Sequence, residues 1–131
     1  MRLLLDSHVF LWSKIDPGKL STPTRAAIMD ADNEVFVSVV TAWELWIKNA
    51  KKPLAAILDG GPSAFLSSVA ESGMQILDIA LGHAAMAARL PPLHRDPFDR
   101  MLIAQATVER LTLVTADADI ARYQHVRLLT S

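Results

Sequence analysis

The sequence predicts an α/β fold with a mostly parallel sheet of about five strands flanked by helices, on three observations. Short continuous apolar runs recur along the chain, as is typical of strands that are covered on both faces of a parallel sheet. Segments with helical spacing of apolar residues separate these runs, so strands and helices alternate. No internal repeat or linker interrupts the alternation over 131 residues, so we expect one domain over residues 1–131.

Five apolar runs are the expected strands. They cover residues 3–5, 35–37, 76–77, 111–114 and 126–129. The first two, Leu3-Leu4-Leu5 and Val35-Phe36-Val37, are bounded by polar residues, and the third is reached from Gly73. Each run is as short as a strand that is buried in a central sheet.

Six helices are expected beside these strands. They cover residues 7–12, 21–32, 38–52, 62–71, 81–90 and 97–110. Ser21 offers a cap for the second helix, with Pro23 just inside its first turn. Residues 52–61 and 91–96, which contain Gly-Gly and Pro-Pro pairs, are the expected loops.

The composition excludes several classes of protein. Hydrophobic residues make up 51% and charged residues 21%, which excludes a disordered chain. Thirteen Lys+Arg against fourteen Asp+Glu give a net charge of -1, so any nucleic-acid binding must be local. The absence of cysteine excludes disulfides and zinc–thiolate sites and suits a reducing cytoplasm. No apolar run matches a signal peptide or the roughly 20 residues of a membrane span, so we expect a soluble cytoplasmic protein without a membrane partner.

Acidic residues are expected at the carboxyl ends of the strands, where open α/β sheets bind ligands. Asp6 directly follows the first strand and Asp117 follows the fourth, although an Asp in such a place can also simply cap a helix. Asp119 lies further from the strand and is expected to cap the residues after it. Glu44 lies on the apolar face of its helix, so this group must be paired, protonated or bound to a cation. Lys48, one turn later, is an available ion-pair partner.

Two further acids begin the helix over residues 97–110. Asp96 precedes Pro97, which is typical of a helix cap followed by proline at the first helical position. Asp99 lies on the side of the helix that continues through Leu102 and Ile103, so it is expected to point toward the edge of the core. A simpler role for Asp99 is stabilisation of the helix dipole, by roughly 0.3–1 kcal/mol.

Together, Asp6, Glu44, Asp99 and Asp117 are expected to meet at one edge of the sheet. Carboxylates in one pocket repel each other, and a divalent cation relieves that repulsion. An oxygen-only cluster suits Mg²⁺ or Mn²⁺ better than zinc. Such a site activates a bound water and neutralises charge on a phosphodiester, so metal-dependent phosphodiester hydrolysis is the matching reaction. The neighbouring hydroxyl residues, which are Ser7, Ser38 and Thr115, are expected mainly as caps.

Four blocks of the sequence resemble, in order and spacing, the acidic motifs of PIN-domain ribonucleases, particularly the VapC-type toxins of prokaryotic toxin–antitoxin pairs. The blocks are Leu4-Leu5-Asp6-Ser7-His8, Ser38-Val39-Val40-Thr41-Ala42-Trp43-Glu44, Asp96-Pro97-Phe98-Asp99-Arg100-Met101-Leu102-Ile103-Ala104-Gln105-Ala106 and Leu113-Val114-Thr115-Ala116-Asp117. The third block is long and specific, and the resemblance extends over essentially the whole chain.

This resemblance implies a five-stranded parallel sheet and Mg²⁺- or Mn²⁺-dependent cleavage of RNA. It also implies a homodimer, and inhibition by a cognate antitoxin of a type II pair. The family's catalytic and metal-binding residues carry over to Asp6, Glu44, Asp99 and Asp117. Asp96 is commonly acidic in this subgroup, so it is a candidate for the metal site, with capping as its default role.

Contacts to RNA can be sought only among local basic and aromatic residues. The basic candidates are Lys48, Lys51, Lys52, Arg95 and Arg100, although Lys51 and Lys52 are better explained as a solvated helix end whose charge complements the helix dipole. The three tryptophans, Trp12, Trp43 and Trp46, could stack bases but more often belong to a core or an interface. His8 adjoins Asp6 and could touch substrate, whereas His83 is expected to be structural.

Two alternatives to a ribonuclease stay open at this point. One is a non-catalytic α/β protein-interaction module whose acids only cap helices, and binding of Mg²⁺ or Mn²⁺ would discriminate against it. The other is a phosphatase with a strand-end Asp nucleophile, but the haloacid-dehalogenase pattern needs a second Asp where this chain has His8. A receiver domain would need a lysine near the end, where Arg127 stands. Gly60-Gly61 lacks the Lys-Ser/Thr of a phosphate loop.

Overall fold

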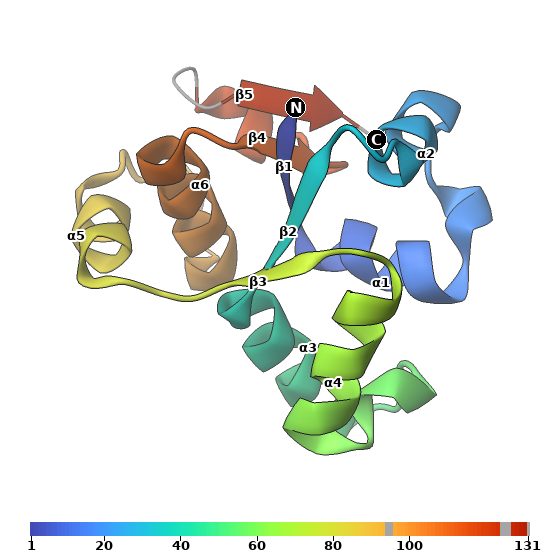
Figure 1. The fold of residues 1–131 in the computed structure, drawn as a ribbon. Coiled ribbons are helices and arrows are strands. Elements are labelled where there is room, and N and C mark those ends of the chain that lie inside the picture. Colours follow the sequence, from blue (N-terminus) through green and yellow to red (C-terminus); the bar gives the residue numbers. More distant parts are fainter. Residues whose placement is uncertain (94–95, 124–126, 131) are drawn as a thin grey trace.

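The structure, a computed structural model, describes residues 1–93, 96–123 and 127–130. Within these residues, five strands form one all-parallel sheet in the order β3-β2-β1-β4-β5 (Figure 1). The strands are β1 Arg2–Leu5, β2 Glu34–Ser38, β3 Gln75–Leu77, β4 Thr112–Thr115 and β5 Arg127–Thr130. This confirms the predicted fold class and all five strands; Val126, which the prediction placed in the last strand, lies outside the described residues.

The helices also follow the predicted order. They are α1 Ser7–Ile15, α2 Thr22–Met29, α3 Val39–Lys51, α4 Gly61–Glu71, α5 Leu81–Arg89 and α6 Pro97–Glu109, with short 3-10 turns η1 Pro17–Lys19, η2 Ala56–Leu58 and η3 Ile120–Arg122. The prediction that the second helix extends to about residue 32 is wrong, because the backbone of Asp30 is extended. The Asp30 side chain accepts a hydrogen bond of 2.9 Å from the Asp32 amide and forms a turn toward β2 instead.

Polar side chains fix where four of the helices begin. In each case a side-chain oxygen accepts a hydrogen bond from an amide of the first turn, which would otherwise lack a partner. The caps are Asp6 for α1, Ser21 for α2, Ser38 for α3 and Asp96 for α6. Two of these caps, Asp6 and Asp96, are also candidate site residues, so capping and a second role are compatible in the same side chain.

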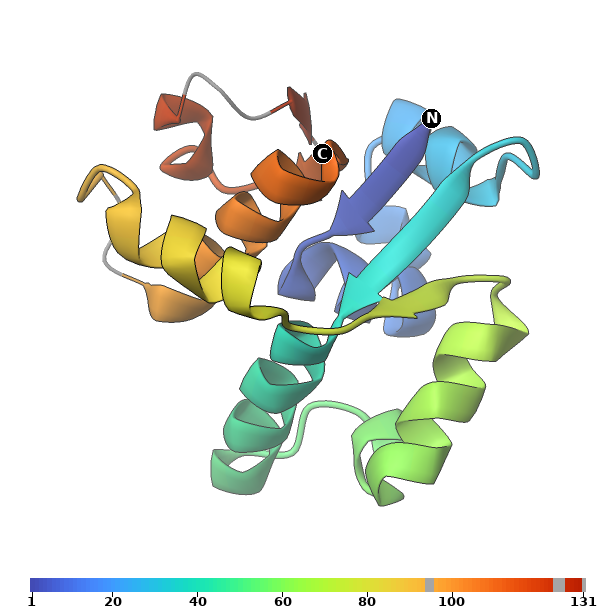
Figure 2. The same cartoon turned by 60° about the vertical axis from the view of Figure 1, so that its left-hand side comes forward.

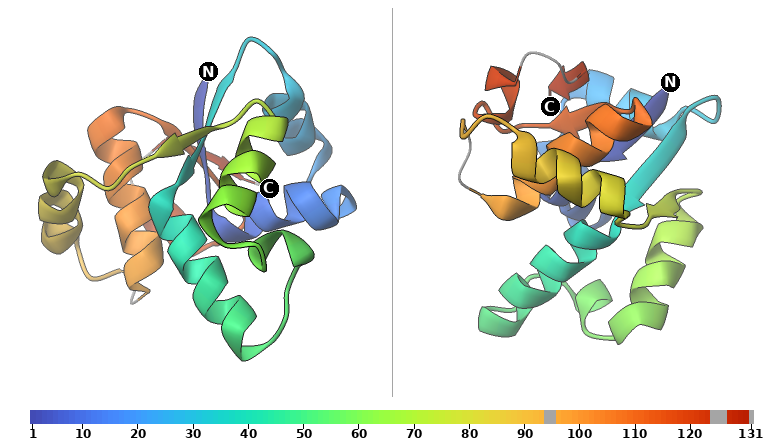
Figure 3. Two further views of the ribbon diagram at one scale, coloured as in Figure 1. Left: turned by 60° about the horizontal axis from the view of Figure 1, so that its bottom comes forward. Right: turned by 90° about the vertical axis from the view of Figure 1, so that its left-hand side faces the viewer.

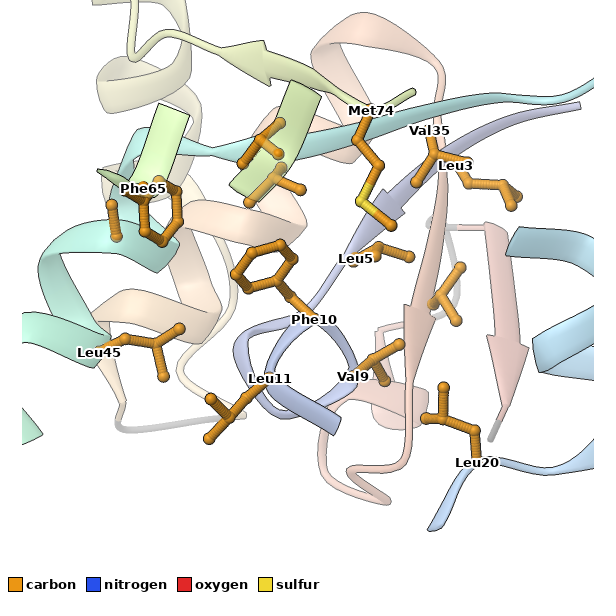
Figure 4. Packing of buried hydrophobic residues seen from close by; sticks show 14 of the residues in the cluster. Leu3, Leu5, Val9, Phe10, Leu11, Leu20, Val35, Leu45, Phe65 and Met74 are labelled. Atoms are coloured by element: carbon orange, nitrogen blue, oxygen red, sulfur yellow. The ribbon is translucent and has the colours of Figure 1, made fainter. Parts of the chain in front are cut away.

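One face of the sheet is covered by α1, α2 and α4 (Figures 2 and 3). Alternation along β1 directs Leu3 and Leu5 to this face. Figure 4 shows Phe10 of α1 between Leu5 and Phe65, and the Phe10 and Phe65 ring centroids lie 5.3 Å apart. Leu45 of α3 joins the same cluster. Full burial of such a side chain stabilises the fold by roughly 1.5–3 kcal/mol.

The opposite face is covered by α5 and α6. Leu4 and Leu113, which pair in register between β1 and β4, pack there against Leu102 and Ile103 of α6. Helix α3 also reaches this cluster through Val40. Because α3 packs into both clusters, its first turns are fixed at the edge of the sheet between the two layers.

The strand order reverses beside β1, since the chain moves outward through β2 and β3 and then returns to the other side of β1 as β4 and β5. Figure 2 shows the arrowheads of β1 and β2 pointing to the same edge, where α1 and α3 begin. In open α/β sheets, a crevice for ligands forms at such a reversal, beyond the carboxyl ends of the strands. Within the described ranges, none of the helices is both long and apolar enough to cross a membrane.

Candidate active site

A pocket of about 370 Å³ lies at this carboxyl edge of the sheet. Its acidic wall consists of Asp6, Glu44, Asp96, Asp99 and Asp117. The remaining lining residues are His8, Trp12, Lys48 and Ala116. The structure therefore brings together all four acids that were selected from the sequence, and it adds Asp96 to them.

Asp6 enters the pocket from the junction of β1 and α1 and is 4% exposed. One carboxylate oxygen accepts a hydrogen bond of 2.8 Å from the Val9 amide, and the other accepts a hydrogen bond from the Thr115 hydroxyl. Burial raises the pKa of the Asp6 carboxyl, and the nearby Asp117 carboxylate raises it further. The hydrogen bonds from Thr115 and Val9 and the His8 charge oppose that rise. Asp6 is therefore a carboxyl group whose charge is costly in the absence of a cation.

Glu44 lies on the second turn of α3 and is 3% exposed. Its Oε1 accepts a hydrogen bond of 2.6 Å from the Ser7 hydroxyl, and its Oε2 lies 2.7 Å from the Lys48 ammonium. The ion pair that the sequence offered as a structural alternative is thus present. Because the same carboxylate lines the pocket, the ion pair and a role in the pocket do not exclude each other.

The other three acids are half-buried. Asp96 caps α6 by accepting hydrogen bonds from the amides of Phe98 and Asp99, at 2.8 and 3.4 Å, as predicted. Asp99 lies in the first turn of the same helix. Asp117 follows β4, and its Oδ1 accepts a hydrogen bond of 2.8 Å from the Asp119 amide. Asp119 itself was expected to cap η3, but its side chain makes no capping hydrogen bond there.

Two hydroxyl groups hold the buried acids in place. Thr115 donates to Asp6 and accepts a hydrogen bond of 3.0 Å from the Asp117 amide, so it joins both acids across the strand reversal. Ser7 donates to Glu44 and thereby connects the start of α1 to α3. The expectation that Ser7 and Thr115 act mainly as caps is wrong. Ser7 directly follows Asp6 in the sequence and Thr115 precedes Asp117 by two residues, but each hydroxyl donates to an acid of a distant segment.

The donor set fits Mg²⁺ or Mn²⁺ by its chemistry, since the acidic wall offers carboxylate oxygens only. The pKa of Asp6 is raised mainly by burial and to a smaller extent by Asp117, so its negative charge has a cost that a bound cation would reduce. In the part of the chain that the structure describes, no three His, Asp or Glu side chains are already drawn together as a closed metal site. Because one Glu44 oxygen lies against Lys48, a cation at this carboxylate must share it with Lys48 or displace that side chain.

Among the described residues, Lys51, Lys52 and Arg100 do not line the pocket. The Arg100 guanidinium donates to the backbone carbonyls of Ala87, Leu90 and Pro91 at 2.9–3.0 Å, which fixes the end of α5 and leaves Arg100 a structural role. Lys51 is exposed at the end of α3, and Lys52 is the exposed residue that follows it. Arg95 lies outside the described residues.

His83 has the structural role that was predicted. It is buried, and its Nδ1 accepts a hydrogen bond of 3.0 Å from the Ala80 amide at the start of α5. Its Nε2 lies 3.1 Å from a carboxylate oxygen of Glu109 on α6. His83 thus joins α5 to α6.

The three tryptophans occupy three different environments. Trp46 packs edge-on against Phe65 in the first core cluster. Trp43 is 56% exposed and packs edge-on against Phe98. Trp12 is the tryptophan that lines the acidic pocket. Residue type alone did not predict which tryptophan lines the pocket. The available sequence signal was that Trp12 follows His8 by one helical turn.

The chain has a five-stranded parallel sheet, and acids from separate parts of the sequence meet where its strand order reverses, which defines a class of small α/β proteins. The family model described as PIN domain matches residues 3–126. The chain belongs to the PIN-domain family. Among individual proteins, it is 33% identical over 130 residues to Ribonuclease VapC22 of Mycobacterium tuberculosis. That match covers 98% of this chain and 96% of the relative.

Solved structures share the fold at low sequence identity. A VapBC2 complex from Rickettsia felis, bound to a DNA fragment from the promoter, has a TM-score of 0.74 and 17% identity. The structural match covers 99% of this chain and 98% of the matched chain. A DNA-bound VapBC from Salmonella typhimurium has a TM-score of 0.70 and 15% identity, with the same coverage of both chains. These structures support the PIN-like architecture of the whole chain.

Proposed function

We propose that this protein is a Mg²⁺- or Mn²⁺-dependent endoribonuclease that hydrolyses RNA phosphodiester bonds. The observation that carries this proposal is the convergence of Asp6, Glu44, Asp99 and Asp117 on one pocket of a PIN-domain chain. The near full-length similarity to a VapC ribonuclease supports RNA as the substrate.

The proposed catalytic and metal-binding residues are Asp6, Glu44, Asp99 and Asp117. When bound there, Mg²⁺ or Mn²⁺ activates an attacking water and neutralises charge that develops on the phosphodiester. Asp6 and Glu44 provide charge in the least exposed part of the pocket, where hydrogen bonds from Thr115 and Ser7 fix their orientation. Asp99 and Asp117 provide charge in its more accessible part. Asp96, by capping α6, positions the turn that carries Asp99.

We further propose a biological setting for this activity. The VapBC complexes among the structural neighbours support a role as the toxin of a type II toxin–antitoxin pair, inhibited by a cognate antitoxin in the cytoplasm. An exposed apolar strip along α3, formed by Val39, Trp43 and Ile47, supports a homodimer. The single sheet and the family match over residues 3–126 support one PIN-like domain over residues 1–131.

The test is RNA cleavage by the purified protein with Mg²⁺, with Mn²⁺ and with EDTA. We expect cleavage by the wild type only with metal, and none by Glu44→Gln. Glu71→Gln is the matched control, because Glu71 is an exposed acid at the end of α4 that does not line the pocket. Undiminished cleavage by Glu44→Gln, or full cleavage in EDTA, would contradict the proposal. Sequencing the cleaved ends then identifies the RNA target.

A further inference from the structure

An aromatic pair on α1 lies on the pocket wall beside the acids. His8 and Trp12 are one helical turn apart, so their side chains lie on the same face of α1. Their ring centroids are 5.7 Å apart with an interplanar angle of 37°. Both residues line the pocket, and α1 begins at the Asp6 cap. The two rings therefore stand at the same pocket as the proposed cleavage chemistry.

Trp12 is held in place by the core. It is half-buried and packs against the cluster formed by α1, α2 and α4, while it also lines the pocket. The ammonium of Lys19, an exposed side chain just after α1, lies 5.9 Å from the Trp12 ring centroid. A ring that is already fixed loses little conformational freedom when a ligand stacks on it. Lys19 has the flexible stem of an exposed lysine and can exchange this cation–π contact for a phosphate.

The charge of the pocket shows why an RNA substrate needs such a contact. The lining includes five carboxylate side chains and one lysine, and that Lys48 ammonium is already paired with Glu44. A phosphodiester that approaches this wall is repelled unless cations are bound. Binding energy that does not depend on charge must then come from the bases. Stacking on an aromatic ring supplies it for any base sequence, since every base has a π-face.

We infer that Trp12 is a base-stacking residue for single-stranded RNA, which holds a base next to the cleaved phosphodiester, while Lys19 contacts the RNA backbone. This inference rests on the proposed ribonuclease activity and assigns a binding subsite to it. Trp12 contributes to substrate affinity, so its loss raises KM more than it lowers kcat. Lys19 contributes a charge contact that is independent of the bases.

The test compares oligouridine with an abasic oligomer of equal length, so that both probes carry the same phosphate charge. Equilibrium binding is measured by fluorescence anisotropy with Mg²⁺ in an Asp99→Asn background, which prevents cleavage. We expect oligouridine to bind about tenfold more tightly than the abasic oligomer. Trp12→Leu, which still fills the core side of the site, abolishes this preference, and Trp12→Phe retains most of it.

Two further variants separate the base contact from other effects. Lys19→Gln weakens both probes by the same factor and lowers the salt dependence of binding. Trp43→Leu removes an exposed tryptophan outside the pocket and leaves the preference for oligouridine unchanged. Retention of that preference by Trp12→Leu, or equal binding of the two probes by the Asp99→Asn protein with Trp12 intact, would overturn the inference.

A second measurement needs no change at Trp12. In a Trp43→Phe, Trp46→Phe background, Trp12 is the one remaining tryptophan of the three in the chain. Oligouridine is then expected to quench its fluorescence and the abasic oligomer is not; equal quenching by both overturns the inference. Wild-type cleavage is assayed in parallel. A protein that discriminates between the probes without cleaving RNA would contradict the ribonuclease proposal but support the base-stacking site.

Discussion

The acidic pocket has two parts that hold their carboxylates in different ways. The inner part, Asp6 and Glu44, is almost fully buried, and each carboxylate accepts a hydrogen bond from a hydroxyl group on another element. The outer part, Asp96, Asp99 and Asp117, is half-buried, and the hydrogen bonds of Asp96 and Asp117 given above run to amides within three residues.

This difference shows which part of the pocket depends on the whole fold. The Ser7–Glu44 bond joins residues 37 positions apart, and the Thr115–Asp6 bond joins residues 109 positions apart. The inner part is therefore correct only when the sheet is complete, whereas local turns are enough for the capping bonds of the outer part. Substitutions should then have their largest effects in the inner part and their smallest effects at the outer caps.

The largest effect is expected from Asp6→Asn. We expect cleavage to fall by more than about 100-fold, because loss of a proposed metal ligand should exceed the effect of losing its supporting hydrogen-bond partners. The metal-free protein should become more stable, since Asn can still cap α1 without a buried charge. RNA cleavage and thermal unfolding in EDTA measure the two changes, with the exposed Asp32→Asn as the control. A lower Tm in EDTA for Asp6→Asn would contradict the electrostatic account.

The same carboxyl group should make the metal-free stability depend on pH. Because the pKa of Asp6 is raised above 3.8, the folded protein binds this proton more tightly than the unfolded chain does. Stability from this group is therefore present at low pH and is lost as pH rises through the interval between 3.8 and the raised pKa. Thermal unfolding in EDTA across this interval, for wild type against Asp6→Asn, should show a difference that grows with pH. A stability difference between the two proteins that does not change with pH would contradict the assignment of this pH dependence to Asp6.

The next effect is expected at Thr115. Thr115→Val keeps the shape of the side chain but removes the hydroxyl that donates to Asp6 and accepts from Asp117. If Asp6 binds metal as proposed, we expect metal affinity or activity to fall by roughly 10–100-fold, as it does when a residue that orients a metal ligand is lost. Thr115→Ser retains the hydroxyl and should keep most activity. Cleavage rates over a Mg²⁺ titration distinguish the two variants, and equal losses in both would assign the effect to packing.

A smaller effect is expected at Lys48, which stabilises Glu44 in the absence of metal. Its side chain is 43% exposed, so Lys48→Gln should lower the free energy of unfolding in EDTA by only about 1 kcal/mol. Mg²⁺ should raise the Tm of this variant more than that of wild type, because it relieves an unpaired Glu44. Thermal shift assays with and without Mg²⁺ measure this difference. An identical Mg²⁺ shift in both proteins would mean that Lys48 and the cation do not share this carboxylate.

The smallest effect is expected at the outer cap Asp96. Asn caps helices about as well as Asp, so Asp96→Asn should leave cleavage within about twofold and Tm nearly unchanged. Asp96→Ala removes the cap and should cost about 0.5–2 kcal/mol of stability. Unfolding and cleavage assays on both variants test this. A loss of cleavage in Asp96→Asn as large as that in Asp99→Asn would place Asp96 in the metal site instead.

The fold and the position of the acids followed from local sequence patterns. Apolar runs gave the strands, and the strand-end position of Asp6 and Asp117 placed them correctly at one pocket. Asp99 was placed by its helix face. These properties depend on residues close together in the chain, which is why a single sequence was sufficient to predict them.

The partners of the acids did not follow from the sequence. The contacts of Ser7 with Glu44 and of Thr115 with Asp6 join distant segments, so they depend on how the elements pack. Arg100 stands beside Asp99 in the sequence, yet its guanidinium donates to carbonyls at the end of α5. Side-chain direction and tertiary contacts decide each of these cases, and neither has a local signature.

The central position of β1 also affects how the protein is synthesised. Parallel strands cannot pair until the connecting segment between them exists, and β1 completes its pairing only with β4, near the other end of the sequence. A ribosome-bound chain that has been translated only through α6 contains Asp6 without Thr115 or Asp117. The pocket is therefore incomplete during most of translation, and a chain still under synthesis lacks the full acidic site beside the message that encodes it.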